Sequence, residues 1–266
     1  MKHYQRSLKG FCWLTAVLGL VLFSFNALAA DADSLLDKIV QRGYILVGMT
    51  GDYKPFTYLK PADNKFEGID VDMAQALGRA LGVEVRFVKT SWPTLMKDFQ
   101  EGKFDLGVGG ISINLERQKK GFFSICYLVD GKTPITRKEN VAKFQTLEQI
   151  DQPGVRVIVN PGGTNEKFAR ANLKKATLTV YQDNVTIFDQ IVQGKADLMI
   201  TDAVETILQQ KLRPELASVH PDKPFTYSEK GYLMPRDLVF KLWVDQWMHL
   251  AMNDGTFSKI YDAWLK

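Results

Sequence analysis

The segment 110–117, GISINLER, combines a glycine, two hydrogen-bonding side chains and an arginine. Gly110 lets backbone N–H groups approach a ligand closely, and Ser112 and Asn114 can donate hydrogen bonds. The planar guanidinium of Arg117 matches a carboxylate in two parallel hydrogen bonds. This segment therefore predicts a carboxylate-binding loop, although a single arginine on a helix is more often a solvated surface residue.

The segment 161–166, PGGTNE, lies between a predicted strand and a predicted helix. Free N–H groups at a helix start attract an anion, and Thr164 and Asn165 add polar side chains there. Glu166 places a carboxyl group directly after the turn. The alternative interpretation is plain capping, with Thr164 as the cap and Glu166 as a favourable acid in the first turn. The local sequence leaves both interpretations open.

Asp202 ends a predicted strand in MITDA. Its carboxylate could bind an amino group, or it could cap the helix that follows. Tyr53, Phe56 and Trp92 could form aromatic walls of a binding site, although aromatic residues at such positions are also common in cores. Ligands of open α/β sheets bind beyond the carboxyl ends of the strands. The convergence of these loops therefore predicts one small-molecule cleft.

Two series of alternating strands and helices must position these loops. Such alternation predicts parallel sheets with helical crossovers, and hence an α/β protein with two units and a cleft between them. A helical, amphipathic segment closes the chain. The predicted strands are 44–49, 83–88, 104–108, 155–159, 178–181 and 198–201, and the predicted helices are 35–42, 70–81, 93–100, 165–173, 185–193, 203–211, 236–252 and 257–265.

Residues 1–29 have the pattern of a secretory signal peptide. Lys2, Arg6 and Lys9 give a positive start, residues 11–25 are apolar and uncharged, and ALA at 27–29 supplies a cleavage site. The apolar run is shorter than the ~20 residues that a membrane-spanning helix needs. We therefore expect export to the periplasm and no membrane contact after the signal is removed.

Charge and cysteine content exclude several classes of protein. The formal charge of +4 falls to about +1 without the three positive charges of the signal, and no basic run indicates a nucleic-acid partner. Cys126 is the one cysteine after the signal, so we expect a buried structural thiol and no internal disulfide. His220 and His249 lack ligand spacing, so we expect no metal.

Several segments, in order and spacing, resemble periplasmic solute-binding proteins that bind polar amino acids. The resemblance implies a type II periplasmic-binding-protein-like fold, with two α/β lobes joined by crossing strands near 127–136 and 224–233. We expect lobe 1 to contain 30–130 and 228–266, and lobe 2 to contain 131–227. The matching segments are GDYKPFTY, FEGIDVDMAQALGRALG, GKFDLGVGGISINLERQK, FSICY, GKADLMITDA and NDGTFSKIYDAWL.

This resemblance also implies roles for individual residues. The residue matching Arg117 binds an α-carboxylate in that family, and those matching Gly110, Ser112 and Thr164 assist it. The residue matching Asp202 binds the amino group. Asn114 departs from the pattern, because the family usually has threonine there.

Other segments resemble the periplasmic cyclohexadienyl dehydratases, which share the solute-binding fold. The resemblance implies conversion of prephenate to phenylpyruvate, or arogenate to phenylalanine, without a cofactor and with Glu166 as general acid. That role needs a protonated carboxyl group, so we expect burial and an anionic substrate to raise the pKa of Glu166. The segments are TGDYKPF, TSWPTLMKDF, GISINLERQ, DGKTPIT, FQTLEQIDQPGV and NPGGTNEKFARANLKKA.

Two other functions suit the same fold: a non-catalytic amino-acid-binding protein of an ABC transporter, and a secreted sensor partner. Glu166 favours the dehydratase, because a passive carboxylate binder gains little from an acid aimed at its ligand. The sequence does not rank prephenate against arogenate. It also leaves open whether the chain forms a homo-oligomer, and how Asp202 is tolerated beside prephenate.

Overall fold

The computed structural model describes residues 33–265, and the predicted signal peptide lies outside them. The first sheet has the order β5-β1-β6-β15-β7. Its first three strands are parallel and the last two pair antiparallel, so the chain returns to this sheet near its end. The strands are β1 (Tyr44–Met49), β5 (Glu84–Lys89), β6 (Leu106–Gly107), β7 (Phe122–Phe123) and β15 (Leu233–Met234).

Helices pack on this sheet through apolar faces. In α3 (Ile69–Leu81), Ile69, Met73 and Leu77 are fully buried, and burial of each such side chain contributes about 1.5–3 kcal/mol. The helix ends at Gly82, whose φ of 71° is the left-handed conformation of a glycine C-cap. The other helices of this part are α2 (Leu35–Arg42), α4 (Leu95–Gln100), α5 (Leu115–Gln118), α10 (Leu238–Asn253) and α11 (Thr256–Leu265).

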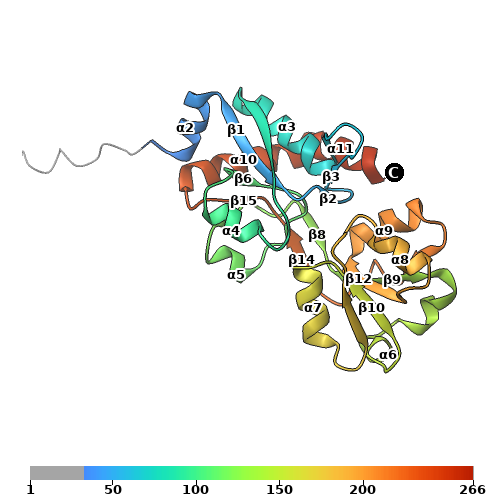
Figure 1. The fold of residues 1–266 in the computed structure, drawn as a ribbon. Coiled ribbons are helices and arrows are strands. Elements are labelled where there is room, and N and C mark those ends of the chain that lie inside the picture. Colours follow the sequence, from blue (N-terminus) through green and yellow to red (C-terminus); the bar gives the residue numbers. More distant parts are fainter. Residues whose placement is uncertain (1–32, 266) are drawn as a thin grey trace, which may run out of the picture. The chain divides into compact units, whose positions relative to one another are not determined.

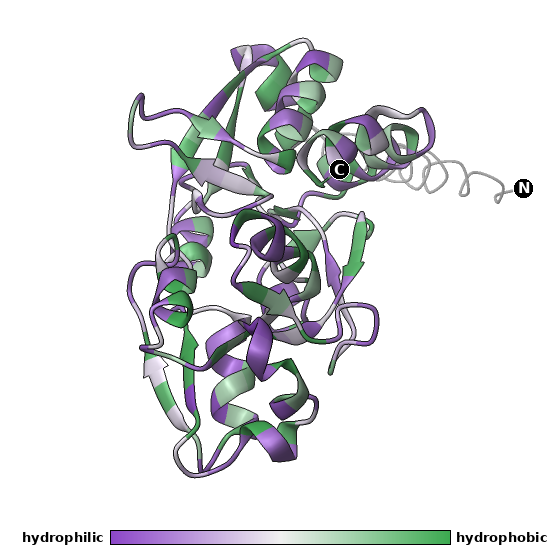
Figure 2. Cartoon of the chain, turned by 90° about the vertical axis from the view of Figure 1, so that its right-hand side faces the viewer, coloured by the Kyte–Doolittle hydropathy of each residue, from purple (hydrophilic) through white to green (hydrophobic). Residues whose placement is uncertain are grey.

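The second sheet has the order β11-β10-β12-β9-β13, with a parallel part and an antiparallel part. Figure 2 shows helices that carry both hydrophobic and hydrophilic stretches, as expected of helices that cover a core. The strands are β9 (Lys132–Arg137), β10 (Arg156–Val159), β11 (Thr177–Val180), β12 (Leu198–Asp202) and β13 (Leu216–Ser218). The helices are η1 (Lys138–Lys143), α6 (Leu147–Ile150), α7 (Thr164–Asn172), α8 (Ile187–Val192) and α9 (Ala203–Leu212).

Two crossing strands join the lobes that these sheets form. Strands β8 (Leu128–Asp130) and β14 (Ser228–Lys230) pair antiparallel between them (Figure 1). This confirms the predicted two-lobed fold and its hinge strands. The lobe boundaries at 130/131 and 227/228 stay a prediction. A small sheet made of β2 (Asp52–Tyr53), β3 (Thr57–Leu59) and β4 (Phe66–Glu67) lies after β1.

The predicted helices and long strands are present, with ends that differ by at most two residues. The strand predicted at 104–108 is shorter and contains only Leu106–Gly107, and the Phe104 ring packs in the core beside it. One expectation is wrong: Cys126 is only partly buried. Within residues 33–265 no helix is long and apolar enough to span a bilayer.

Candidate functional site

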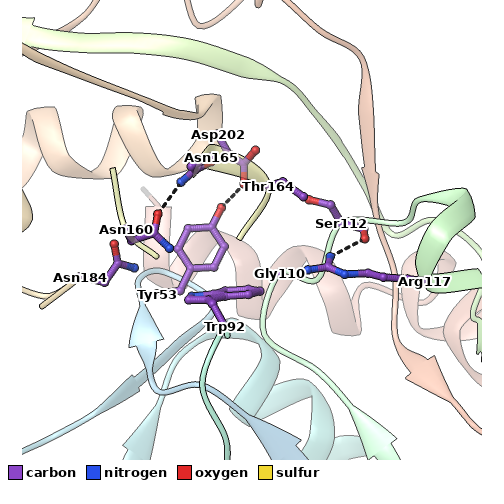
Figure 3. Close-up of a pocket in the computed structure, with 10 residues that line it drawn as sticks. All are labelled: Tyr53, Trp92, Gly110, Ser112, Arg117, Asn160, Thr164, Asn165, Asn184 and Asp202. Carbon is purple, nitrogen blue, oxygen red and sulfur yellow. Dashed lines mark hydrogen bonds between the residues drawn. The ribbon is translucent and has the colours of Figure 1, made fainter. Parts of the chain in front are cut away.

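A cavity with a volume of ≈ 300 Å³, including space open to solvent, lies between the two lobes. Only ≈ 20 Å³ of this space is free for a water-sized molecule, well below the about 300–1,000 Å³ of typical ligand sites, so the lobes nearly close over the site in this structure. Residues of both lobes, mostly from loops and helix starts, point into it (Figure 3). The lining residues are Tyr53, Trp92, Gly110, Ser112, Arg117, Asn160, Thr164, Asn165, Asn184 and Asp202.

Arg117 enters the cavity from the short helix α5. Asn114 caps this helix, since its Oδ1 accepts the backbone N–H of Arg117 at 2.9 Å. The Arg117 side chain donates to the carbonyl of Ser112 at 2.8 Å, and burial lowers its pKa to about 10, so it stays charged near neutral pH. Within the described residues no carboxylate forms an ion pair with it. The remaining guanidinium donors are therefore available to a ligand carboxylate.

Asp70 holds the glycine loop that precedes Arg117. This carboxylate is fully buried, and its Oδ2 accepts the backbone N–H groups of Gly109 at 2.8 Å and Gly110 at 2.7 Å. The hydroxyls of Tyr127 and Tyr232 also donate to it, at 2.7 and 3.0 Å. Asp70 thereby fixes the backbone beside the cavity, a role that the sequence analysis did not assign.

Asp202 does not cap α9, because its side chain accepts no hydrogen bond from that helix. Its Oδ1 accepts from Lys132 Nζ at 2.7 Å. Its Oδ2 accepts from Lys230 Nζ at 2.5 Å and from the Tyr53 hydroxyl at 2.6 Å. Burial alone would raise the pKa of Asp202, but the two ammonium groups outweigh it and hold the pKa well below its usual range.

Two lysines, one on the crossing strand β14 and one just after the crossing strand β8, complete this group and were not predicted from the sequence. Lys132 begins β9 and is the ladder partner of Asp202. Lys230 ends β14 and is bridged to Ser112. Each lysine stands beside polar residues, in DGKTPIT and in SEKG, so the local sequence does not mark either one as buried. Pairing across the sheet, which brings them to Asp202, cannot be read from one sequence.

The two lobes touch each other around the cavity. The hydrogen bond from Tyr53 to Asp202 crosses between them, and Asn184 Nδ2 donates to the carbonyl of Asp52 at 3.0 Å. Gly162 has a φ of 75°, and a Cβ atom there would lie 2.6 Å from the Cα of Pro93. Only glycine allows this approach, so the turn 161–163 meets the opposite lobe directly.

Thr164 and Asn165 lie in the first turn of α7 and line the cavity. Gly163 is the N-cap residue and makes no side-chain cap, so the alternative interpretation of Thr164 as the cap is wrong. Thr164 Oγ1 instead accepts from Lys132 Nζ at 2.9 Å, and Asn165 Oδ1 accepts from the same ammonium. The amide nitrogen of Asn165 donates to Asn160 at 3.0 Å, which orders the second lobe's wall.

Glu166 lies at the edge of this site and is not among the lining residues. Its Oε2 accepts the backbone N–H of Gly162 at 2.7 Å, and its Oε1 accepts from Arg170 Nε at 2.8 Å. The Gly162 hydrogen bond, followed by Arg170, lowers the pKa of Glu166 below its ordinary value of 4.5. The sequence led us to expect a raised pKa for Glu166, because that expectation assumed a buried side chain beside a bound anion.

Eight of the eleven predicted site residues line the cavity. The exceptions are Glu166, Asn114 and Phe56. Phe56 is fully buried and packs 5.1 Å, centroid to centroid, from the ring of Tyr53, so it supports the aromatic wall from behind. Among residues 33–265, no cluster of three His, Cys, Asp or Glu side chains lies close enough to hold a metal ion.

Glu205 is a second buried carboxyl group behind the cavity. Thr201 Oγ1 donates to its Oε2 at 2.5 Å, and Asn165 donates to Thr201 at 2.9 Å. Burial, with a contribution from the charge of Asp202, raises the pKa of Glu205 to about 8. The side chain is therefore mainly protonated at neutral pH and adds little negative charge.

We expect Glu205→Gln to flatten the pH dependence of stability. The folded pKa of about 8 lies above the ordinary 4.5, so the wild type loses stability as pH rises from 4.5 towards 8. Between pH 5 and 8 the loss from this group is at most on the order of 4 kcal/mol. Urea unfolding of both proteins at pH 5 and 8 measures it, and equal losses in the two proteins would contradict a raised pKa.

Known proteins resemble this chain along nearly its whole length. It is 55% identical over 258 residues to the cyclohexadienyl dehydratase of Pseudomonas aeruginosa, covering 97% of this chain and 96% of the relative. It is 28% identical to the L-cystine-binding protein TcyJ of Escherichia coli K12, covering 98% of this chain and 95% of the relative. The dehydratase is thus far more similar in sequence to this chain than that cystine-binding protein is.

Among solved structures, too, a dehydratase and an amino acid-binding protein resemble this chain, and the dehydratase has the higher sequence identity. An ancestral cyclohexadienyl dehydratase is 54% identical, covers 88% of this chain and 97% of its own, and has a TM-score of 0.56. An ancestral amino acid-binding protein, described as a precursor of that enzyme, is 36% identical, covers 88% and 100%, and has a TM-score of 0.81. The sequence model of the bacterial extracellular solute-binding proteins, family 3, matches residues 45–266. The chain therefore belongs to the bacterial extracellular solute-binding proteins, family 3.

Proposed function

We propose that this chain is a cyclohexadienyl dehydratase, a carbon–oxygen lyase that acts on prephenate and arogenate. The observation that carries the proposal is 55% identity to a cyclohexadienyl dehydratase across 97% of the chain. The cavity supports it, because Arg117 offers a buried cation for a carboxylate. We also propose export to the periplasm, with residues 1–29 as the signal.

The reaction balances without a cofactor. Prephenate dianion and one proton give phenylpyruvate anion, CO2 and water. The ring–carboxylate bond breaks, its electron pair enters the ring, and the ring hydroxyl leaves with the added proton. Hydroxide is a poor leaving group, so a positioned acid is worth about 10²–10⁴ in rate. Aromatisation supplies the driving force.

In the proposed complex, Arg117 binds the side-chain carboxylate of the substrate. Ser112 and Thr164 line the cavity on either side and donate hydrogen bonds to the substrate. Tyr53 and Trp92 stand edge to face with centroids 5.7 Å apart, and they offer an aromatic wall to the ring. Such positioning lowers the barrier, because the substrate is held in one reactive arrangement.

Glu166 is the proposed proton donor. It follows the turn 161–163, which touches the other lobe, and it is next in sequence to Asn165, which lines the cavity. Its pKa is low in this structure because Gly162 and Arg170 both stabilise the carboxylate. We propose that a bound dianion reverses this balance, since nearby negative charge disfavours a second carboxylate.

Arg170 should therefore tune the acid. This arginine is largely exposed, with 61% of its side-chain surface accessible, so its attraction for Glu166 is partly screened. We expect Arg170→Gln to raise the pKa of Glu166 and to move the alkaline limb of the kcat profile to higher pH. Stopped-flow rates between pH 5 and 9 measure this shift. A limb that stays in place or moves to lower pH would contradict the assignment.

The dehydratase proposal is tested by mixing the purified protein with prephenate and following phenylpyruvate by its absorbance in alkali. We expect turnover that, at low prephenate concentration, is much slower in an Arg117→Met control prepared in the same way. If no phenylpyruvate appears while calorimetry detects tight amino-acid binding, the chain is a non-catalytic binding protein instead.

A further inference from the structure

Asn184 lines the cavity and carries a buried oxygen that has no hydrogen-bond partner. The residue is 6% exposed, and its Nδ2 donates to the backbone carbonyl of Asp52, in the other lobe, at 3.0 Å. That hydrogen bond assigns the other amide atom as the oxygen. No donor among the described residues reaches Oδ1, although most buried acceptors in proteins are paired. A hydrogen-bond donor on a ligand would satisfy this atom, since Asn184 is part of the cavity wall.

The position of Asn184 determines which end of a ligand can reach it. Figure 3 shows Asn184 on the side of the cavity away from Arg117. Asn184 follows the edge strand β11, whereas Asp202, whose charge acts on Arg117, ends β12. Strand β10 lies between these two strands. A ligand whose carboxylate is bound by Arg117 would therefore present its opposite end to Asn184.

The ring hydroxyl is the donor that both substrates can offer at that end. The prephenate dianion has two carboxylates and a keto oxygen, which only accept hydrogen bonds, so its ring hydroxyl is its single donor. Arogenate has a second donor in its ammonium group, but this group stands beside the side-chain carboxylate and hence near Arg117. The hydroxyl is on the ring carbon opposite the side chain. In both substrates it is therefore the group that can donate to Asn184 Oδ1.

We propose that Asn184 Oδ1 accepts a hydrogen bond from the ring hydroxyl that leaves in the reaction. This inference rests on the proposed function and adds a contact at the bond that breaks. With its hydrogen held by Asn184, the hydroxyl keeps its lone pairs free for the acid, for which Glu166 is proposed. The proton of the acid joins one lone pair, the electron pair of the carbon–oxygen bond stays with the oxygen, and water leaves. Asn184 itself neither gives nor takes a proton.

Closure of the lobes strengthens the effect of this contact. The hydrogen bond from Asn184 to Asp52 joins the lobes, and in this arrangement Oδ1 is shielded from solvent. An acceptor that has lost its water and has found no donor is unfavourable. A ligand with the ring hydroxyl removes that loss, whereas the same ligand without the hydroxyl does not. The ring hydroxyl therefore favours closure of the lobes.

Phenylpyruvate and 4-hydroxyphenylpyruvate form a matched pair for the test, because they differ only by a hydroxyl on the ring carbon opposite the side chain. We expect calorimetry to show that the wild type binds the hydroxylated ligand at least about threefold tighter, as one hydrogen bond allows. Asn184→Leu removes the acceptor and should abolish this preference. Asn184→Asp keeps an acceptor oxygen and loses the amide donor to Asp52, so it should weaken both ligands while it retains the preference. Gln182→Leu removes an exposed amide from the same loop and should leave the ratio unchanged.

Asn184→Val makes the same removal with a smaller side chain and covers the case in which the leucine variant fails to fold, as judged by thermal unfolding. With prephenate, the folded apolar variant should lose tenfold or more in kcat/KM. Equal or weaker binding of 4-hydroxyphenylpyruvate by the wild type overturns the proposal, as does a wild-type ratio or a wild-type kcat/KM in that variant. Absence of turnover by the wild type overturns the dehydratase proposal alone, because the binding ratio needs no turnover.

Discussion

Glu166→Gln is expected to lower kcat for prephenate by ~10²–10⁴, with KM close to that of the wild type. Glutamine occupies the same space, and its amide oxygen can still accept the N–H of Gly162, as the carboxylate does at 2.7 Å. The turn that meets the other lobe is thereby kept. The amide cannot release a proton to the departing hydroxyl, so only the chemical step suffers.

Steady-state kinetics with prephenate, together with calorimetry of phenylpyruvate, separate these two effects. Glu116→Gln is the matched control, because it makes the same chemical change on the neighbouring helix α5, where the Glu116 side chain is 75% exposed. It should retain full kcat. If Glu166→Gln also keeps full turnover, another group supplies the proton and the assignment of Glu166 fails.

The sequence predicted the elements well because most are long and periodic. Helix 70–81 was expected from apolar residues at helical spacing that end at Gly82, and the structure has it at Ile69–Leu81. The elements that were not predicted include β2, β3, β4 and α5, each two to four residues long. Such short segments contain only about one period of either pattern, which is too little for a periodicity to be detected.

Some site residues were predicted from the sequence and others were not, and the physical reason differs between the two groups. Arg117 and Thr164 lie in the segments that follow strands β6 and β10, and the rule that ligands bind beyond strand ends places them in one cleft. Lys132 and Lys230 reach the same place through antiparallel pairing and through the hinge, which link positions far apart in sequence. A single sequence carries no information on that pairing, and a lysine is expected at the surface.

The protonation of Glu166 shows a further limit of local reasoning. Its expected high pKa depended on burial, whereas the structure gives it a backbone donor and an arginine at i+4. A Glu–Arg pair at that spacing in TNEKFAR can be read from the sequence. Whether the Glu166 carboxyl group points to Arg170 or to a ligand depends on the arrangement of the two lobes and on the bound substrate. The local sequence carries no information on either.

Arg117→Met is expected to weaken binding of phenylpyruvate and prephenate by roughly 30- to 3,000-fold, which corresponds to about 2–5 kcal/mol for removing one partner of a buried charge pair. Arg117 is 9% exposed and lines the cavity, so its interaction with a carboxylate is weakly screened. Arg117→Lys keeps the charge without the planar fork, so it should recover only part of the affinity.

The same substitution should behave differently in the free protein. Burial lowers the pKa of Arg117 to about 10, which means that its charge is held at a cost in desolvation until a ligand arrives. Methionine removes that cost and fills similar volume, so Arg117→Met should unfold at the same or a higher temperature than the wild type. Calorimetric titration of the two variants tests the expected loss of affinity, and thermal unfolding tests the expected stability of the free protein. Unchanged affinity in Arg117→Met would contradict the carboxylate site, and a large fall in unfolding temperature would show that Arg117 serves the fold instead.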